Sequence, residues 1–203
     1  RNSDTIMAVL FDEILTQGVR SGQIPAQTAK ARDWYRKTAQ DYGKVSEKQL
    51  FGKKSDKDRM ASRPMIGGMY MYEYMAKGRK TLPYYDRLPL IFPFKMVKGG
   101  FYGLNMHYLP LPLRAKLMDA LYETTNNKAY DETTKLKINY QILSKAAKFE
   151  PFKPCVKRYL TSQVQSKFMY VYPSEWDIAL FLPTERFVGA SKSTVWSQSK
   201  KKI

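Results

Sequence analysis

The stretch Gly67-Gly68-Met69-Tyr70-Met71-Tyr72-Glu73-Tyr74 decides the expected fold, because a glycine pair introduces a run of β-forming side chains. A basic turn, Lys77-Gly78-Arg79-Lys80, follows it. Residues 88–97 form a second apolar run, and Gly99-Gly100 leads into a third at 101–109. The second run contains two prolines, which cannot donate to a ladder and predict a bent or edge strand. Short strands joined by tight turns predict a small, curved, SH3-like or other half-barrel antiparallel sheet.

Helices are predicted on the N-terminal side of this sheet. Ser3 or Asp4 can cap a helix over 4–21, and a second helix starts near Pro25 and ends about Tyr42. We interpret residues 1–43 as a helical docking arm, since an apolar helix before a flexible linker commonly binds a partner. Residues 44–64 scatter few apolar side chains among many cations, which predicts a basic linker.

Mostly helical structure is predicted after the sheet. Pro112 opens one helix, the Asp131 region caps another, and Pro154 starts a third. A short strand is predicted near 168–172, followed by a compact apolar segment at 176–187. The fold class is therefore α+β, with a core domain over 65–190 and a basic C-terminal tail over 191–203.

The charge of the chain restricts its partners. In 203 residues, 35 Lys and Arg oppose 18 Asp and Glu, a formal net charge of +17. Nucleic-acid phosphates, an anionic membrane or an acidic protein could neutralise it. No apolar run approaches the roughly 20 residues of a membrane span, and no signal peptide is recognisable. We expect no membrane partner. We also expect that further residues precede Arg1 and that the protein assembles inside a cell.

Side chains for catalysis or metal binding are scarce. His107 lies in an apolar run and is interpreted as a satisfied structural histidine, and Cys155, which has no partner for a disulfide, as a small core residue. No phosphate-cradling loop or dinucleotide-binding glycine pattern is present. We therefore predict a non-enzymatic protein without a cofactor, metal or small-molecule substrate. A divergent DNA-end nuclease is the alternative from a different class.

Two sets of residues are candidates for binding. The first consists of cations that could contact nucleic acid or an acidic partner, with a merely solvated surface as the alternative: Lys48, Lys53, Lys54, Lys57, Arg59, Arg63, Lys77, Arg79, Lys80, Lys200, Lys201 and Lys202. The second consists of apolar or aromatic side chains at a partner interface: Ile6, Leu10, Ile14, Tyr84, Tyr85 and Trp176. The tyrosines among residues 70–74 could stack on bases, form an interface or fill the core.

Four strings carry a resemblance to a known family. They are TLPYYDRLPL (81–90), GLNMHYLP (103–110), FKPCVKRYL (152–160) and EWDIALFLP (175–183). Over about residues 65–200 the chain resembles small virion proteins of T-even-like contractile-tailed phages. The resemblance implies a structural role inside the virion, assembled in the host cytoplasm and bound to other virion proteins. It leaves two roles open: a DNA end protector on the packaged double-stranded genome, or a baseplate or tail-hub subunit of a contractile tail whose basic charge meets acidic protein partners.

Overall fold

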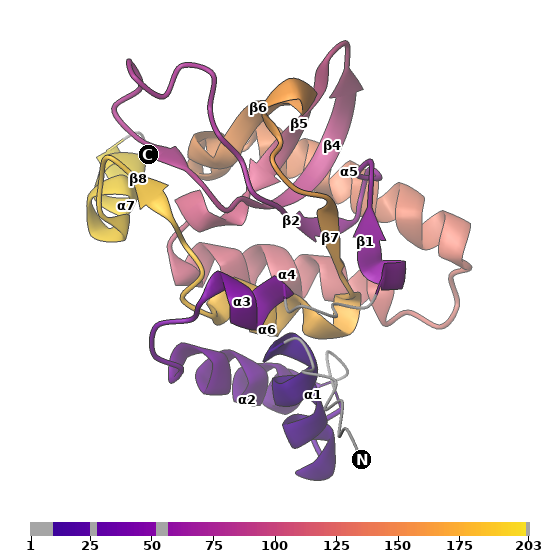
Figure 1. Ribbon diagram of the computed structural model, residues 1–203. Coiled ribbons are helices and arrows are strands. Elements are labelled where there is room, and N and C mark those ends of the chain that lie inside the picture. The colour runs from indigo at the N-terminus through magenta and orange to yellow at the C-terminus, as the bar shows by residue number, and fades with distance from the viewer. Residues whose placement is uncertain (1–9, 25–27, 52–56, 202–203) are drawn as a thin grey trace, which may run out of the picture.

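The computed structural model describes residues 10–24, 28–51 and 57–201, without the side chains of Lys57 and residues 199–201. Its helices are α1 (Leu10–Arg20), α2 (Ala29–Gln40), α3 (Glu47–Phe51), α4 (Leu111–Thr125), α5 (Glu132–Lys148), α6 (Trp176–Phe181) and α7 (Lys192–Lys201). Its strands are β1 (Met60–Ala61), β2 (Met69–Met71), β3 (Tyr85–Asp86), β4 (Leu90–Val97), β5 (Gly100–Asn105), β6 (Val156–Leu160), β7 (Phe168–Val171) and β8 (Phe187–Val188). Helices packed on an antiparallel sheet confirm the α+β class (Figure 1).

The main sheet has six strands in the order β1-β7-β2-β4-β5-β6, while β3 and β8 form a separate pair. Of the two predicted alternatives for this run, a bent strand or an edge strand, the structure has the bent one, since β4 lies between β2 and β5 in the interior. A register shift between Pro93 and Lys95 bends β4 where Pro93 cannot donate a hydrogen bond. Its partner there is Gly103, which leaves room for this irregularity.

The sheet curls until chain segments beyond two of its non-adjacent strands meet. Tyr74, just past β2, pairs with Val164, just past β6. The Met75 amide donates to the Gln163 carbonyl, and the Gln165 amide donates to Glu73. This closure encloses a cluster of mostly aromatic side chains: Tyr70, Tyr72, Tyr74, Ala76, Ile91, Phe101, Tyr159 and Phe168. The predicted curvature is present, whereas the SH3-like detail remains a prediction.

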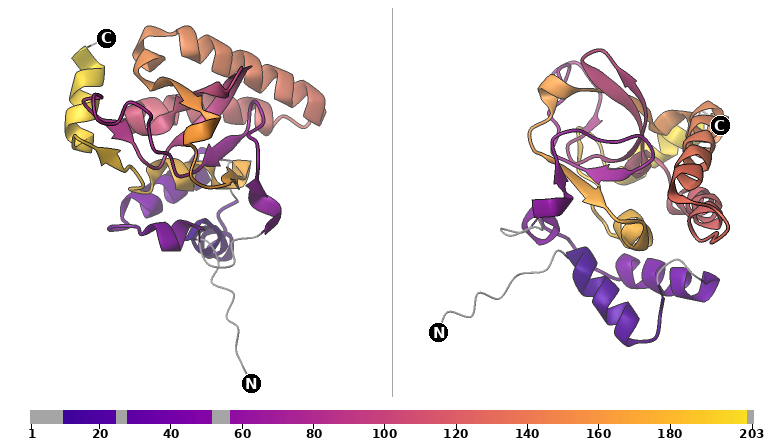
Figure 2. Two further views of the ribbon diagram at one scale, coloured as in Figure 1. Left: turned by 45° about the horizontal axis from the view of Figure 1, so that its top comes forward. Right: turned by 90° about the vertical axis from the view of Figure 1, so that its right-hand side faces the viewer.

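The other face of the sheet holds the larger core, which α4, α5 and α6 help to enclose (Figures 1 and 2). The predicted helix starts are confirmed here. Pro112 lies in the first turn of α4, and the Asp131 carboxylate accepts a hydrogen bond from the Thr134 amide to cap α5. Trp176 is central: its ring packs edge-on against Phe92, and its indole N–H donates to the Val171 carbonyl at 3.2 Å.

The N-terminal helices belong to this same core, which differs from the predicted docking arm. Figure 1 shows α1 and α2 lying against α6. Arg36 of α2 pairs with Asp177 of α6 at 2.7 Å. The segment predicted as a linker also packs down in its described part, since Val45 and Leu50 are buried. Apolar contacts therefore tie residues 10–24 and 28–51 to the rest of the protein.

Two C-terminal predictions differ from the structure. The helix expected from Pro154 is instead strand β6, whose residues pair with β5 from Gly100↔Leu160 to Leu104↔Val156. Valine and tyrosine at 156 and 159 suit a strand, and an available sheet edge decides between the two conformations. The described part of the basic tail is α7, which is held by the fully buried Val195.

Candidate nucleic-acid interface

The basic turn at residues 77–80 is a preformed structure that presents its cations outward. The Arg79 amide donates to the Ala76 carbonyl, and the Thr81 and Leu82 amides both donate to Gly78. Lys77, Arg79 and Lys80 are all exposed. Since backbone hydrogen bonds hold the turn, its three cations can meet an anionic partner without first ordering the loop.

Strand β6 and the β4–β5 hairpin continue this basic surface. Lys98 lies at the hairpin tip, where the Thr161 amide donates to the Gly99 carbonyl and so holds the end of β6 against the hairpin. The register sets Lys95 opposite Tyr102 and Tyr102 opposite Arg158, so these three side chains form a row on one face of the sheet. Lys95 and Arg158 are exposed.

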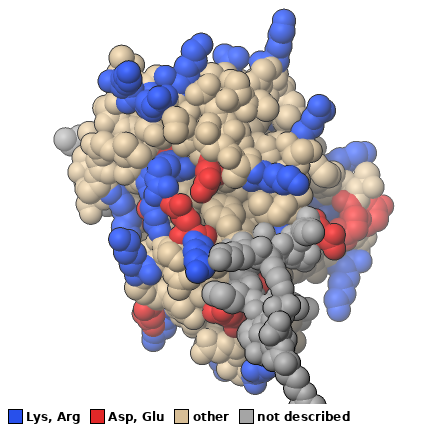
Figure 3. Space-filling view, in the orientation of Figure 1, with Lys and Arg blue, Asp and Glu red and all other residues tan. Residues whose placement is uncertain are grey.

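We call the combined region the β6 surface: Lys77, Arg79, Lys80, Lys95, Lys98, Lys157 and Arg158. Figure 3 shows Lys and Arg side chains projecting from the upper part of the molecule, where acidic side chains are sparse. Lys157 and Arg158 were missed from the sequence because a helix was predicted there. The β-forming side chains of Val156 and Tyr159 were the signal that could have indicated a strand.

Three acidic side chains are engaged in ion pairs inside the fold, each with an arginine. Glu175 pairs with Arg59, Asp177 with Arg36, and Glu185 with Arg114 at 2.8 Å. All three carboxylates are largely buried. Because each pair is neutral, the net charge of +17 is carried by the remaining charged residues.

The other predicted cations do not gather with the turn. Arg59 is buried and donates to both oxygens of Glu175, so it is a structural residue and not a phosphate contact. Lys48 and Arg63 are exposed, but Arg63 follows β1, at the opposite edge of the strand order from β6. Lys53, Lys54 and Lys202 lie outside the described residues, as do the side chains of Lys57, Lys200 and Lys201.

The tyrosines of residues 70–74 fill the core. Tyr70, Tyr72 and Tyr74 are buried, and burial raises the pKa of all three phenols. They are therefore unavailable for base stacking. Tyr84 and Tyr85 are only half-buried, and both line a cleft.

This cleft, which we call the tyrosine cleft, lies between the 76–85 segment and β6 and has a volume of about 390 Å³. Tyr84, Tyr85 and Leu82 form its apolar wall, and Lys77 and Lys157 add cations. The Lys157 ammonium lies 4.1 Å from the centre of the Tyr108 ring, a cation–π contact. The cleft thus combines aromatic surface with positive charge, the two features that single-stranded nucleic acid requires.

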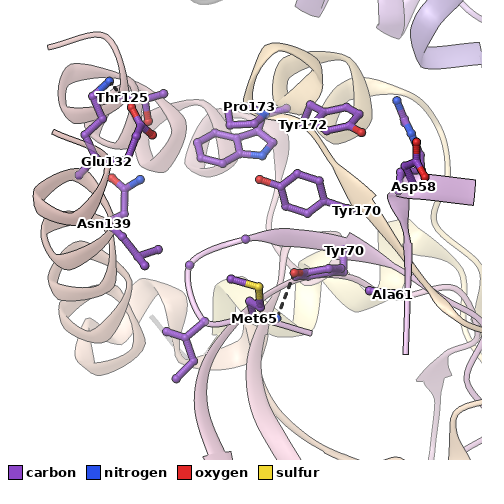
Figure 4. Close-up of a pocket in the computed structure, with 17 residues that line it drawn as sticks. Asp58, Ala61, Met65, Tyr70, Thr125, Glu132, Asn139, Tyr170, Tyr172 and Pro173 are labelled. Atoms are coloured by element: carbon purple, nitrogen blue, oxygen red, sulfur yellow. Dashed lines mark hydrogen bonds and ion pairs between the residues drawn. The ribbon is translucent and has the colours of Figure 1, made fainter. Parts of the chain in front are cut away.

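A second cleft, of about 360 Å³, lies between α5 and the strands β1 and β7 (Figure 4). Asp58 and Glu132 line it together with Lys135 and Arg59, so its charge is mixed. Buried Asn139 also faces it, and Tyr170 projects toward its centre in Figure 4. Because two carboxylates would repel phosphate, this cleft is a poorer nucleic-acid site than the tyrosine cleft.

Three residues predicted at a partner interface are instead core residues. Leu10, Ile14 and Trp176 are buried within the chain. This corrects the prediction, because a side chain covered by its own fold cannot also anchor a partner. Ile6 lies outside the described residues. Tyr84 and Tyr85 keep exposed surface, as stated above.

His107 is the satisfied structural residue that the sequence predicted. Its Nδ1 lies 2.7 Å from Asp86 Oδ2, and its Nε2 lies 2.9 Å from the Thr184 hydroxyl. Asp86 also accepts from Asn105 Nδ2 and from the Leu88 amide. Burial alone would raise the pKa of Asp86, but His107 and these donors outweigh it and lower the pKa below its usual value. His107 and Thr184 have no exposed surface, so a substrate cannot reach the ring.

Cys155 is a buried core thiol, as predicted, and burial raises its pKa to about 12. Within residues 10–24, 28–51 and 57–201, no cluster of three His, Cys, Asp or Glu could hold a metal ion. Among the same residues, no helix is both long and apolar enough to cross a bilayer.

Fold and surface together define a basic α+β protein with a cation-rich, hydrogen-bonded turn beside a tyrosine-lined cleft. A family model described as "Phage T4 terminal DNA protecting protein" matches residues 5–202, and the chain belongs to this family. The match includes the N-terminal helices α1 and α2, whereas the resemblance based on the four sequence strings covered only about residues 65–200. Searches of curated proteins and of solved structures found no match.

Proposed function

We propose that this protein is a non-enzymatic structural component of a phage particle that binds the ends of packaged double-stranded DNA through the β6 surface. The family description names protection of terminal DNA. Two observations carry the location: Lys95 and Arg158 are exposed in one row across the β4–β5 hairpin and β6, and Lys77 of the 77–80 turn lines one cleft together with Lys157 of β6. A protein that covers a duplex end on such a surface denies that end to an exonuclease without performing chemistry.

The electrostatics favour this face over the remainder of the described surface. Its cations come from three adjacent segments, because the 77–80 turn and β6 line one cleft and β6 pairs with β5 of the hairpin. Contacts to phosphate release counterions, so binding should weaken steeply as salt rises. The tyrosine cleft opens beside the same cations and offers a contact that a plain phosphate-binding surface lacks.

The experiment is a protection assay. Linear duplex DNA is incubated with the protein and then digested with a processive double-strand exonuclease, while nicking of circular DNA by an endonuclease serves as the control. We expect slower digestion of the linear DNA and unchanged nicking of the circle. Equal inhibition of both nucleases would indicate general coating of DNA and would contradict an end-protecting role.

The baseplate or tail-hub role remains the alternative proposal. It requires the same cations to face acidic protein, and it predicts that the purified protein neither binds nor protects DNA at moderate salt. Locating the protein in dissected particles, in the head with the genome or in the isolated tail, separates these two roles.

A further inference from the structure

We propose that the tyrosine cleft holds an unpaired terminal nucleotide of the DNA, so that this cleft distinguishes a duplex end from duplex interior. This inference rests on the proposed function and gives it a specific site. The cleft is lined by Tyr84, Tyr85 and Leu82, and Leu82 is 46% exposed. An exposed leucine beside two half-buried tyrosines offers apolar and aromatic surface to a base.

The geometry of the cleft is fixed before any ligand arrives. Tyr85 belongs to β3 and pairs with Val188 of β8, while the hydrogen-bonded turn at 76–82 positions Leu82 and Lys77. Buried Tyr74 and Tyr159 lie beneath the cleft. A ligand therefore meets a rigid site and loses little free energy to ordering it.

The charges at the cleft suit one nucleotide. Lys77 and Lys157 line it and can meet a phosphate next to the bound base. Asp86 also lines it, but its oxygens already accept from Leu88, Asn105 and His107, which reduces its repulsion of an anion. Arg158 lines the cleft too, although the strand register places its side chain in the row with Tyr102 and Lys95.

End selectivity follows from the cost of exposing a base. A base inside a duplex must break its pair and leave two stacking neighbours, whereas a terminal base leaves only one. Extracting a base is cheapest where it is already unpaired. Stacking on an aromatic side chain strengthens binding by roughly 5- to 150-fold per base. The cleft can therefore increase the affinity of the protein for a DNA end. Along the duplex interior the same surface gains no such contribution.

The test compares two DNAs of the same sequence: a linear duplex with blunt ends and the covalently closed, relaxed circle made by ligating it. We expect the protein to bind the linear duplex at least about fivefold more tightly than the circle. Leu82→Asp and the uncharged change Tyr85→Leu should bring that ratio close to one. Leu136→Asp is the matched control, because Leu136 is also 46% exposed but lies on α5. That control should keep the wild-type ratio.

The outcomes separate the cleft from the function on which it rests. Binding to both DNAs with a ratio that the cleft variants leave unchanged would overturn the cleft and leave DNA binding intact. Failure to bind either DNA would overturn the proposed function and the cleft together. As a direct readout, 5-iodouracil at the terminal position should photocrosslink to Tyr84 or Tyr85, and at a central position it should not. A terminal crosslink only to residues outside the cleft would also refute the inference.

Discussion

Replacing the three cations of the preformed turn should change how salt affects DNA binding. The variant Lys77→Gln, Arg79→Gln, Lys80→Gln removes three exposed charges, and the backbone hydrogen bonds of residues 76–82 do not depend on those side chains. The slope of log K against log salt is negative, and each lost phosphate contact reduces its magnitude by about 0.9. If all three cations contact phosphate, the magnitude decreases by roughly 2.7.

The size of the effect follows from that slope. Between about 50 and 200 mM salt, three contacts account for an affinity change of roughly 40-fold. The affinity gap between wild type and variant should therefore shrink by about that factor over this range. Fluorescence anisotropy of a labelled duplex across the salt series measures both slopes, and thermal melting verifies that the variant is folded.

A matched variant provides the control. Lys137→Gln, Lys145→Gln, Lys148→Gln removes the same charge from exposed positions on α5, outside the β6 surface. We expect its slope to stay near the wild-type value. Equal slopes for the two triple variants would mean that overall charge, and not the turn, drives binding, and would refute the placement of DNA on the β6 surface.

Further predictions concern the interior. Trp176→Ala should destabilise the protein by about 3–5 kcal/mol in urea unfolding, since Trp176 is only 2% exposed, and an unchanged midpoint would contradict its core role. Arg59→Met should cost about 3–5 kcal/mol because it leaves Glu175 buried without its cation, and Arg59→Met with Glu175→Leu should recover much of that loss. The stabilising contribution of Asp86, whose folded-state pKa is lowered, should be present above its usual value of 3.8 and be lost as pH falls below it. Asp86→Asn should remove that part of the acid sensitivity in urea titrations at a series of pH values, and an identical pH profile for the variant would show that the contact with His107 contributes nothing.

Local sequence signals predicted the elements that carry their own start and stop residues. The proline in the first turn of α4 and the Asp131 cap of α5 act within a few residues, so both helices were identified correctly. The strands β2 and β4 were identified for the same reason. Segment 156–160 was predicted wrongly because its conformation depends on pairing with β5, some distance earlier in the chain.

The candidate site was predictable only in part. The turn at 77–80 was identified as basic and exposed, since glycine and three adjacent cations rarely fit a core. Arg59 belonged to a similar-looking cationic stretch, yet it is buried against Glu175, 116 residues away. No short-range pattern distinguishes these two cases.

The sequence by itself determined the composition-dependent properties: a charge of +17, the α+β class, the curved antiparallel sheet and the family. The tertiary structure decided which cations and tyrosines face outward. Burial depends on which distant segments meet, and the closure that brings Tyr74 to Val164 buries the tyrosines near β2 while Tyr84 and Tyr85 stay accessible. A cleft exists only where separate segments converge, and a linear pattern of residue types does not record that convergence.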